Sequence, residues 1–282
     1  MSNRRAHLTP KLRRARILER VRAKGQVSVE ELAEAFDASH ETIRRDLSTL
    51  AEAGSLQKVH GGAKLPRRRD EGPFRERLTS NEGAKRAIAG LAARLLSPGE
   101  TLFFDTGSTT LLCAEEAAEI SNLTVVTNST RIAAVLAEGR GGARVFLLGG
   151  EYDGDNAETT GSLAISQIGG FHADHAILGV GALDARGGAM DVSFEEAEIA
   201  RAMIESADEV IVLADSSKLD RSAAYQVCPL SRINHLVCER APKAPLAKAL
   251  AEAAVTVHFW QDPREAKRRG EKTGNRSLTG VS

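Results

Sequence analysis

No apolar run in this sequence approaches the roughly 20 residues that a helix needs to cross a bilayer. The first ten residues carry basic side chains with no apolar stretch behind them, so we expect no signal peptide. Cysteine is scarce as well: Cys113, Cys228 and Cys238 lack the spacing of metal ligands and stand in apolar surroundings, which favours buried free thiols. These absences predict a cytoplasmic protein without membrane spans.

Net charge is also absent, because 38 Lys and Arg residues balance 38 Asp and Glu residues. The balance hides an asymmetry: residues 1–70 hold 16 basic against 9 acidic side chains, and residues 71–282 hold 22 against 29. A basic N-terminal part on an acidic remainder indicates that only the former meets a polyanion. The length of 282 residues suits a small domain followed by a medium one.

The basic part of the chain predicts three helices. An amphipathic helix is expected from Pro10 to about Lys24. Ser28-Val-Glu-Glu31 is a capping-box pattern and predicts a short second helix over about Val29–Phe36. After a tight turn, a third helix is expected over about Ser39–Ala53, with its first residue as the N-cap. A short turn between the second and third helices is typical of a helix-turn-helix.

The third predicted helix has two distinct faces. Ile43, Leu47 and Leu50 recur at helical spacing and are expected to face a core. The opposite face carries short polar groups and two guanidiniums, Arg44 and Arg45. Such a face is either an ordinary solvated helix surface or one that enters the DNA major groove. The segments before and after this helix favour the groove.

A β-hairpin is predicted directly after the third helix, because apolar and polar residues alternate around Gly61-Gly62. A basic hairpin in this place is a wing that can contact the sugar-phosphate backbone or the minor groove. Its candidate phosphate contacts are Lys58, His60 and Lys64, in a role that does not depend on DNA sequence.

These residues carry a family resemblance. The spacing of Arg13, Ile17 and Val21 with Ser39 and Thr42–Leu47 resembles the signature of the DeoR family of bacterial transcriptional regulators, which the "HGG" at the wing also matches. The resemblance implies a winged helix-turn-helix domain over residues 1–66. Within the signature, Asp46 is expected to be structural and to pair with a neighbouring arginine. The residues predicted to bind DNA are Ser28, Ser39, His40, Thr42, Arg44, Arg45, Lys58 and His60.

Residues 67–80 are predicted to form a linker, in which Phe74 to Leu78 is expected to continue as a short helix joining the domains, and residues 81–260 a second domain. Short apolar runs alternate with helical segments in this second domain, which predicts a Rossmann-like α/β fold with a mostly parallel sheet. Ligands of such sheets bind beyond the carboxyl ends of the strands. The polar and basic tail over 261–282 is expected to be disordered.

Loops rich in Gly, Ser and Thr are expected at that edge of the sheet. The first follows a predicted strand over Thr101–Phe104 and opens a helix, where free amides and hydroxyls suit a phosphate. One such loop could be a turn with a cap, but four at one edge favour a phosphorylated small molecule. The residues of these loops predicted to bind it are Asp105, Gly107, Ser108, Thr109, Thr110, Thr127, Asn128, Ser129, Gly149, Gly150 and Gly161.

The second domain as a whole resembles the sensor domain of DeoR-family regulators, which is itself similar to ribose-5-phosphate isomerase. The resemblance implies that Asp184 and Glu196 bind sugar hydroxyls. It also implies that Lys218 pairs with a phosphate or carboxylate, although a surface salt bridge is the alternative for this lysine.

The resemblance to the isomerase does not extend to its catalytic groups. The isomerase has an aspartate at the position of Gly181, and a lysine where this chain offers only Arg186. General acid–base catalysis needs a positioned pair of groups, so we expect binding without turnover. We expect no cofactor and no metal, because His172, Asp174 and His175 straddle the start of a strand and favour packing roles.

Together these features predict a transcriptional regulator, a repressor of a carbohydrate operon that is relieved by a phosphorylated sugar or related metabolite. Its expected partners are a double-stranded DNA operator, the effector and further copies of itself, because paired recognition helices read paired half-sites. Homodimer and homotetramer both stay open. The alternatives are an activator and a sugar-phosphate isomerase with a DNA-binding head.

Overall fold

The computed structural model of the protein describes residues 9–24, 26–52, 56–59, 61–64, 67–68 and 72–260. Contacts divide the chain into two compact units, Met1–Arg67 and Arg68–Ser282, called here the N-terminal and the C-terminal unit. In the described part of the chain, no helix is long and apolar enough to cross a membrane. The expectation of a disordered tail over 261–282 lies outside these residues.

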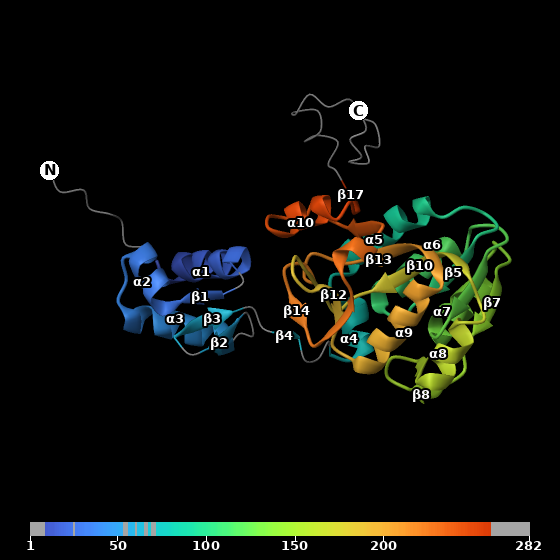
Figure 1. The fold of residues 1–282 in the computed structure, drawn as a ribbon, viewed down its shortest axis with the longest axis horizontal. Coiled ribbons are helices and arrows are strands. Elements are labelled where there is room, and N and C mark those ends of the chain that lie inside the picture. Colours follow the sequence, from blue (N-terminus) through green and yellow to red (C-terminus); the bar gives the residue numbers. More distant parts are fainter. Residues whose placement is uncertain are drawn as a thin grey trace, which may run out of the picture. The chain divides into compact units, whose positions relative to one another are not determined.

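The N-terminal unit is a helix-turn-helix with a small antiparallel sheet (Figure 1). Its strands lie in the order β1-β3-β2, so the predicted wing hairpin is confirmed and the unexpected strand β1 pairs with it. Gly62 permits this pairing, because a Cβ there would lie 2.1 Å from the Val27 carbonyl oxygen. The elements are α1 (Pro10–Lys24), β1 (Gln26–Ser28), α2 (Val29–Phe36), α3 (His40–Glu52), β2 (Gln57–Val59) and β3 (Gly62–Lys64).

Local capping defines the helix-turn-helix. Ser28 Oγ accepts a hydrogen bond from Glu31 N at 3.0 Å and begins α2 as the capping-box pattern predicts. The Glu31 carboxylate does not complete that box; it pairs with Lys24 instead. Asp37 ends α2 in the left-handed region, at φ 48°, and Ser39 Oγ accepts from Thr42 N at 3.1 Å to begin α3.

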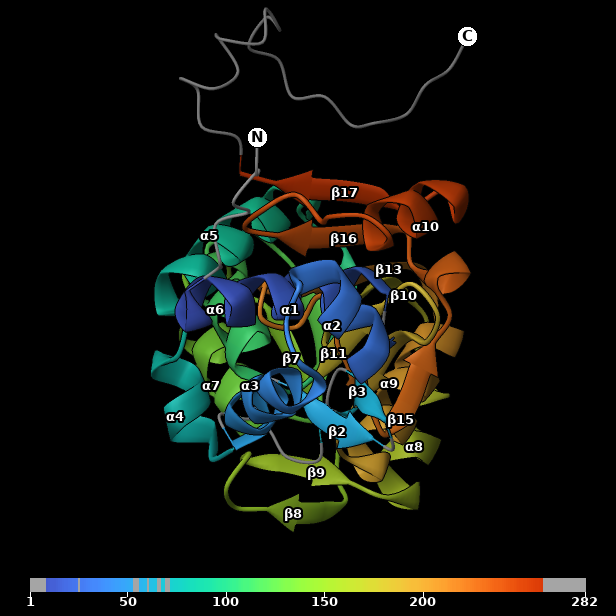
Figure 2. The same ribbon diagram turned by 90° about the vertical axis from the view of Figure 1, so that its left-hand side faces the viewer.

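The C-terminal unit is built on a seven-stranded, fully parallel sheet in the order β17-β16-β13-β10-β5-β6-β7. Figure 2 shows the β17, β16, β13 and β10 end of this sheet. The predicted Rossmann-like α/β fold is therefore confirmed. The strands are β5 (Thr101–Phe104), β6 (Thr124–Thr127), β7 (Arg144–Leu147), β10 (Ala173–Gly179), β13 (Ala207–Leu213), β16 (His235–Cys238) and β17 (Thr256–Phe259).

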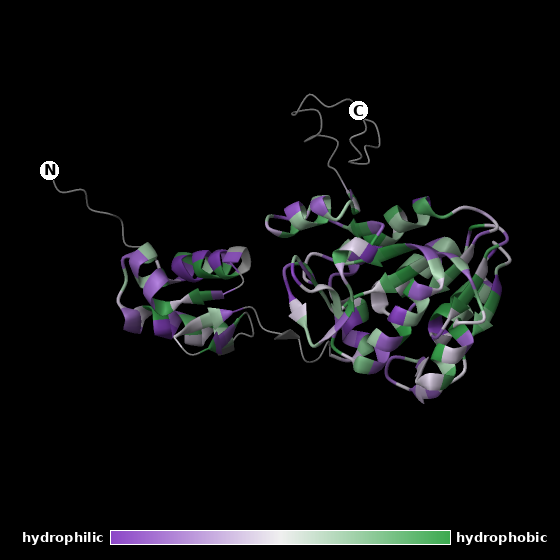
Figure 3. Cartoon of the chain, in the orientation of Figure 1, coloured by the Kyte–Doolittle hydropathy of each residue, from purple (hydrophilic) through white to green (hydrophobic). Residues whose placement is uncertain are grey.

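Helices cover both faces of this sheet, so its strands are apolar on both sides. Leu102 and Phe104 pack with the helices α4 to α7, whereas Phe103 between them packs with α8, α9 and α10. The strands accordingly stand out as hydrophobic in Figure 3. The helices are α4 (Phe74–Thr79), α5 (Glu82–Ala92) with the short η1 (Ala93–Leu95), α6 (Ser108–Ala117), α7 (Thr130–Glu138), α8 (Ser162–Ile168), α9 (Phe194–Glu205) and α10 (Leu246–Glu252).

Short antiparallel elements decorate the carboxyl edge of the sheet and were not expected. β8 pairs with β9 as a hairpin, and β12 lies between β11 and β15 in a three-stranded sheet. No strand was predicted over any of these three- or four-residue segments. Their bounds, with those of the remaining short elements, are β8 (Glu151–Asp153), β9 (Glu158–Thr160), β11 (Ala182–Asp184), β12 (Gly188–Asp191), β15 (Tyr225–Cys228), β4 (Arg67–Arg68), β14 (Ser222–Ala223) and η2 (Leu230–Arg232).

The order of the parallel strands places a topological switch between β5 and β10. From β5 the chain continues through β6 and β7 on one side, and from β10 through β13, β16 and β17 on the other. The loops after β5 and β10 therefore diverge at the carboxyl edge. In open α/β sheets this crevice is where ligands bind.

Candidate functional site

The outer face of α3 is the first candidate surface. Ile43, Leu47 and Leu50 are buried as predicted, which leaves Arg44 and Arg45 exposed. The Arg45 Nε lies 3.2 Å from a carboxylate oxygen of Glu41 one turn earlier, with both side chains largely in solvent. Exposed pairs of this kind contribute only about 0–1 kcal/mol to stability, so the Arg45 guanidinium can exchange Glu41 for a polyanion.

Four other predicted DNA contacts lie at the starts of α2 and α3 and on the wing. The hydroxyls of Ser28 and Ser39 are both used as helix caps, and His40 is exposed at the first position of α3. Lys58 Nζ, on β2, donates to Ser48 Oγ on α3 at 3.0 Å, which links the wing to the helix. His60 lies outside the described residues.

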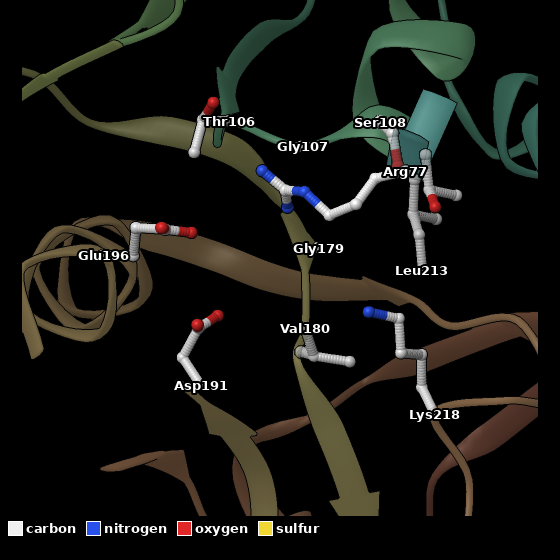
Figure 4. A pocket seen from close by; sticks show the side chains of 11 residues that line it. Arg77, Thr106, Gly107, Ser108, Gly179, Val180, Asp191, Glu196, Leu213 and Lys218 are labelled. Atoms are coloured by element: carbon white, nitrogen blue, oxygen red, sulfur yellow. The ribbon is translucent and has the colours of Figure 1, made fainter. Parts of the chain in front are cut away.

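The second candidate site is a pocket at the switch point of the C-terminal unit (Figure 4). It brings together the loop after β5, the end of β10, the end of β12, the start of α9 and the loop after β13. Its lining residues are Arg77, Thr106, Gly107, Ser108, Thr109, Gly179, Val180, Asp191, Glu196, Leu213 and Lys218.

One side of the pocket is the N-terminus of α6, which Gly107 precedes. Its φ of +148° suits glycine, and a Cβ would lie 2.9 Å from Thr110 Oγ1. Ser108 and Thr109, the first residues of α6, line the pocket. The amides of a helix N-terminus attract anions. Behind them the buried Lys85 Nζ donates to Ser108 Oγ at 2.8 Å and adds positive charge.

The opposite side of the pocket is acidic. Asp191 and Glu196 line it, and Asp105 and Glu158 lie buried close behind. Burial, reinforced by the negative charges of Asp191 and the other two carboxylates, raises the pKa of Glu196 to about 10. Burial likewise raises the pKa of Glu158 to about 7 and that of Asp105 well above its ordinary value. A cluster that holds protons in this way offers hydroxyl donors and acceptors to a polar ligand.

Two cations complete the pocket. Figure 4 shows Lys218 reaching toward it from the side opposite Asp191, while Arg77 extends toward Thr106 and Glu196. Arg77 Nη2 donates to Asn156 Oδ1. The side-chain nitrogen of Asn156, Nδ2, donates in turn to Glu196 Oε1 at 3.2 Å. The site thus combines a helix N-terminus and two cations with carboxylates, which matches a ligand that has an anionic end and a hydroxyl-bearing end.

The structure brings five of the fourteen predicted effector residues to this pocket: Gly107, Ser108, Thr109, Glu196 and Lys218. The others lie beside it or further along the same edge. Asp105 is buried in the first loop, and Thr110 Oγ1 donates to the carbonyl of Gly107, the N-cap of α6. The pocket therefore draws on the first predicted loop and not on all four.

The loop after β6 supports the site from behind. Asn128 Nδ2 donates to Glu158 Oε2 at 3.2 Å, Thr127 Oγ1 accepts from Ser129 N, and Ser129 caps α7. None of these three side chains lines the pocket.

The three predicted glycines of the third and fourth loops do not line the pocket. Gly149 N donates to Gln167 Oε1, Gly150 stands against the carbonyl of Thr160, and Gly161 precedes α8. A direct role of these glycines in ligand binding stays a prediction.

Asp184 has a different place from the one expected of a ligand. Its Oδ1 accepts from the amides of Arg186 and Gly187, and its Oδ2 accepts from Ser222 Oγ at 2.7 Å. These bonds hold the turn between β11 and β12 outside the pocket lining. The carboxylate that reaches the pocket from this small sheet is Asp191, at the far end of β12.

The histidines near the start of β10 lie at the opposite edge of the sheet. His172 pairs with Asp208, and His175 lies between Glu100 and Glu209 at 3.6 and 3.5 Å. In the described part of the chain, no group of three or more His, Cys, Asp or Glu residues could hold a metal ion.

Sequence reasoning missed six lining residues. Thr106 lies inside the predicted loop, and its Oγ1 is buried without a hydrogen-bond partner among the described residues. Asp191 is the last residue of β12 and stands two residues before the N-cap serine of α9, a position that could have signalled it. Arg77 lies in a segment predicted to be linker. The other three are Gly179, Val180 and Leu213.

Comparison with known proteins assigns both parts of the chain. The DeoR-like helix-turn-helix domain matches residues 13–69, and the DeoR C terminal sensor domain matches residues 80–240. The glycerol-3-phosphate regulon repressor of Escherichia coli K12 is 32% identical over 243 residues, which cover 86% of this chain and 96% of the relative. The transcriptional repressor AccR of Agrobacterium fabrum is 38% identical over 229 residues, covering 80% and 88%.

Among solved structures, ribose 5-phosphate isomerase A of Methanocaldococcus jannaschii aligns with 50% of this chain and 55% of its own. The sequence identity is 20% and the TM-score 0.37.

Proposed function

The chain belongs to the DeoR family of transcriptional regulators, and from this premise we propose that it is a repressor of carbohydrate or glycerol-phosphate genes controlled by a phosphorylated small molecule. DNA binding is assigned to the helix-turn-helix domain and effector sensing to the C-terminal domain. The relatives named above are repressors, which favours repression over activation and over the isomerase alternative. Because the target is chromosomal DNA, we expect the protein to act in the cytoplasm.

One observation carries the effector assignment: the pocket places the N-terminus of α6 opposite carboxylates. A phosphate seated at Ser108 and Thr109 would accept from free amides, with Lys218 adding positive charge. Hydroxyls on the rest of the ligand would meet Asp191 and Glu196. A phosphorylated polyol or sugar satisfies both halves, whereas an unphosphorylated sugar leaves the α6 end empty.

On the DNA side, α3 would enter the major groove and the wing would contact the backbone. Arg44, Arg45 and His40 are exposed basic groups of α3, and Lys58 and Lys64 carry positive charge on the wing. Two half-sites require two such helices, so we propose a homodimer or a dimer of dimers.

Relief of repression requires that the effector bind the DNA-free conformation more tightly than the DNA-bound one. Equal affinity for both states would shift nothing. The proposal therefore includes two conformations of the protein, one of which the occupied pocket favours.

A two-step experiment tests this function. Thermal unfolding is first followed in glycerol 3-phosphate, ribose 5-phosphate and glucose 6-phosphate, with glycerol, ribose and glucose as matched controls. A compound at 100 times its Kd adds about 2.7 kcal/mol of stability. Binding to a DNA duplex selected by the protein from a random library is then measured by fluorescence anisotropy with and without that compound.

We expect a phosphorylated compound, and not its unphosphorylated counterpart, to raise the unfolding temperature and to weaken DNA binding. A protein that selects no DNA sequence, or one stabilised equally by glucose and glucose 6-phosphate, would contradict the proposal.

A further inference from the structure

Helix α4 is joined to the effector pocket more closely than its sequence suggests. It lies within residues 70–79, between the segments that match the two DeoR-family domains. Its residue Arg77 nevertheless lines the pocket. Every other lining residue belongs to the sensor match over 80–240.

The side chain of Arg77 is tied to the acidic half of the pocket. Its Nη2 donates to Asn156 Oδ1, and Asn156 Nδ2 donates to Glu158 Oε1 at 2.9 Å and to Glu196 Oε1 at 3.2 Å. The guanidinium also lowers the pKa of both glutamates against the opposing effect of burial. Arg77 is therefore linked through Asn156 to Glu196, one of the groups that would receive the hydroxyls of an effector.

The backbone of α4 is tied to the phosphate half. Lys85 Nζ donates both to the carbonyl oxygen of Arg77 and to Ser108 Oγ. Ser108 begins α6, where the phosphate would sit. A phosphate that engages Ser108 changes the surroundings of Lys85, and through Lys85 those of the last turn of α4.

The two ends of α4 contact further pocket loops. Phe74, at its start, is buried, its N–H donates to Asp155 Oδ2 at 3.4 Å, and the Arg131 guanidinium lies 4.1 Å from the centre of its ring. Asn81, just beyond its end, donates to Asp215 Oδ1 at 3.2 Å, in the loop that carries Lys218. Two loops, the one after β8 and the one after β13, thus contact this six-residue helix or the residue just beyond it.

The position of α4 in the chain gives these contacts a consequence. The DNA-binding match ends at residue 69, and α4 begins at Phe74, so α4 is the first helix after the DNA-binding domain. A change at the pocket that displaces α4 acts directly on the segment that leads to that domain.

We propose that Arg77 is the contact through which effector occupancy is transmitted to α4. Without effector its guanidinium binds Asn156; with effector it turns to the anionic or hydroxyl groups of the ligand, and α4 keeps only the Phe74–Asp155 bond to the loop after β8. This differential contact supplies the preference for one conformation that relief of repression requires. The inference rests on the function proposed above.

The test compares wild-type protein with Arg77→Met, and with Arg75→Met as the matched control. Arg75 is exposed on the same helix and does not line the pocket. The full-length chain is titrated with glycerol 3-phosphate, ribose 5-phosphate and glucose 6-phosphate, and the Kd for the library-selected duplex is measured without and with each. The ratio of the two DNA affinities is the readout, and typical allosteric couplings give roughly 5- to 150-fold.

We expect Arg75→Met to keep the wild-type ratio of DNA affinities. Arg77→Met should still bind the effector, but its ratio of DNA affinities should lie within about twofold of one. Should Arg77→Met fold poorly, Arg77→Lys and Asn156→Ala decide the question. Arg77→Lys keeps the charge without the forked donors and should show a reduced ratio. Asn156→Ala removes the effector-free partner and should weaken DNA binding before any effector is added.

A wild-type ratio in Arg77→Met would overturn the inference, and so would a complete loss of effector binding, which would make Arg77 an ordinary ligand anchor. The inference would also be overturned if Arg77→Lys kept the wild-type ratio of DNA affinities and Asn156→Ala bound DNA without effector as tightly as the wild type. If the wild-type protein responds to none of the three compounds, the proposed function itself fails, so the two failures are distinguishable.

Discussion

The Nε of Arg13, on α1, lies 2.5 Å from Oδ2 of Asp46, on α3, and the two side chains are only 13% and 7% exposed. This pair fixes the candidate recognition helix to the first helix of the domain. It agrees with the expectation that Asp46 pairs with a neighbouring arginine and is not aimed at DNA. An ion pair shielded in this way is costly to break from one side, because the remaining charge stays buried.

Asp46→Asn should therefore lower the stability of the N-terminal domain by about 1–3 kcal/mol. The loss should appear in the helical circular-dichroism signal. It should not appear in the fluorescence of Trp260, the sole tryptophan, which lies in the C-terminal unit. Glu41→Gln is the matched control, since it breaks an exposed pair on the same helix. Equal unfolding curves for Asp46→Asn and wild type would contradict a structural role.

Arg44 is the group of α3 whose removal should affect sequence reading most. Arg44→Ala should weaken binding to the selected duplex by about 1–3 kcal/mol and relax the preference at one base pair, if the guanidinium contacts a base edge. Anisotropy on the selected duplex and its single-base variants measures both effects. Unchanged affinity in Arg44→Ala and in Arg45→Ala would remove α3 from the DNA interface.

Lys58→Ala provides the contrast within the same domain. A backbone contact by the wing predicts weaker binding to every duplex and a shallower dependence on salt, without a change in base preference. The hydrogen bond from Lys58 to Ser48 must be exchanged for a phosphate contact, so the loss should be small. A change of preference at one base pair would instead make Lys58 a base reader.

The regular elements were predictable because burial on two faces leaves a clear pattern. The apolar run Thr101–Phe104 is β5, and the helix expected over Val29–Phe36 is α2 with the same bounds. Each of these segments has local sequence features that agree with its place in the fold.

The pocket was less predictable, because its residues come together only through long-range contacts. Asp184 and Asp191 stand at opposite ends of the same small sheet, and the sequence favoured the first although only the second lines the pocket. Arg77 belongs to a six-residue helix within a charged segment, which looks like a solvated linker until Asn156 and Lys85 are brought beside it. Long-range contacts of this kind leave no periodic pattern of hydrophobic residues in the sequence.

The acidic cluster predicts a pH-dependent stability of the C-terminal domain. The folded state raises the pKa of Glu196 to about 10 and that of Glu158 to about 7, mainly through burial. The folded protein thus keeps protons that the unfolded chain releases above its ordinary carboxyl pKa, so stability falls as the pH rises. The fall should run from the ordinary carboxyl pKa through about 7 for Glu158 and continue for Glu196.

Glu196→Gln should remove part of this dependence. The unfolding temperature reported by Trp260 fluorescence should fall between pH 5 and pH 9 in the wild type, and fall less in Glu196→Gln. Glu195→Gln is the matched control, because Glu195 is exposed beside it. A Glu196→Gln curve parallel to that of the wild type would show that this carboxylate is ionised in the folded protein.

Thr106 offers the sharpest test of the pocket, because its hydroxyl is buried against the pocket without a partner among the described residues. A buried polar group left without a hydrogen bond costs about 1–3 kcal/mol, and its replacement by an apolar group of the same shape is neutral or stabilising. Thr106→Val should therefore unfold at the same or a higher temperature than the wild type. If an effector phosphate or hydroxyl is the missing partner, the same substitution should weaken effector binding.

Effector affinity should fall by about 1.5–3 kcal/mol, roughly tenfold or more, if the lost bond is to a charged phosphate. Thr106→Ser should restore most of it, because the hydroxyl returns. Thr110→Val is the contrasting variant: Thr110 Oγ1 already donates to the Gly107 carbonyl at 3.0 Å, so its loss should lower stability. Isothermal titration and thermal unfolding of the three variants separate the two roles. A Thr106→Val protein that is destabilised yet binds the effector as the wild type does would assign the hydroxyl to the fold and not to the ligand.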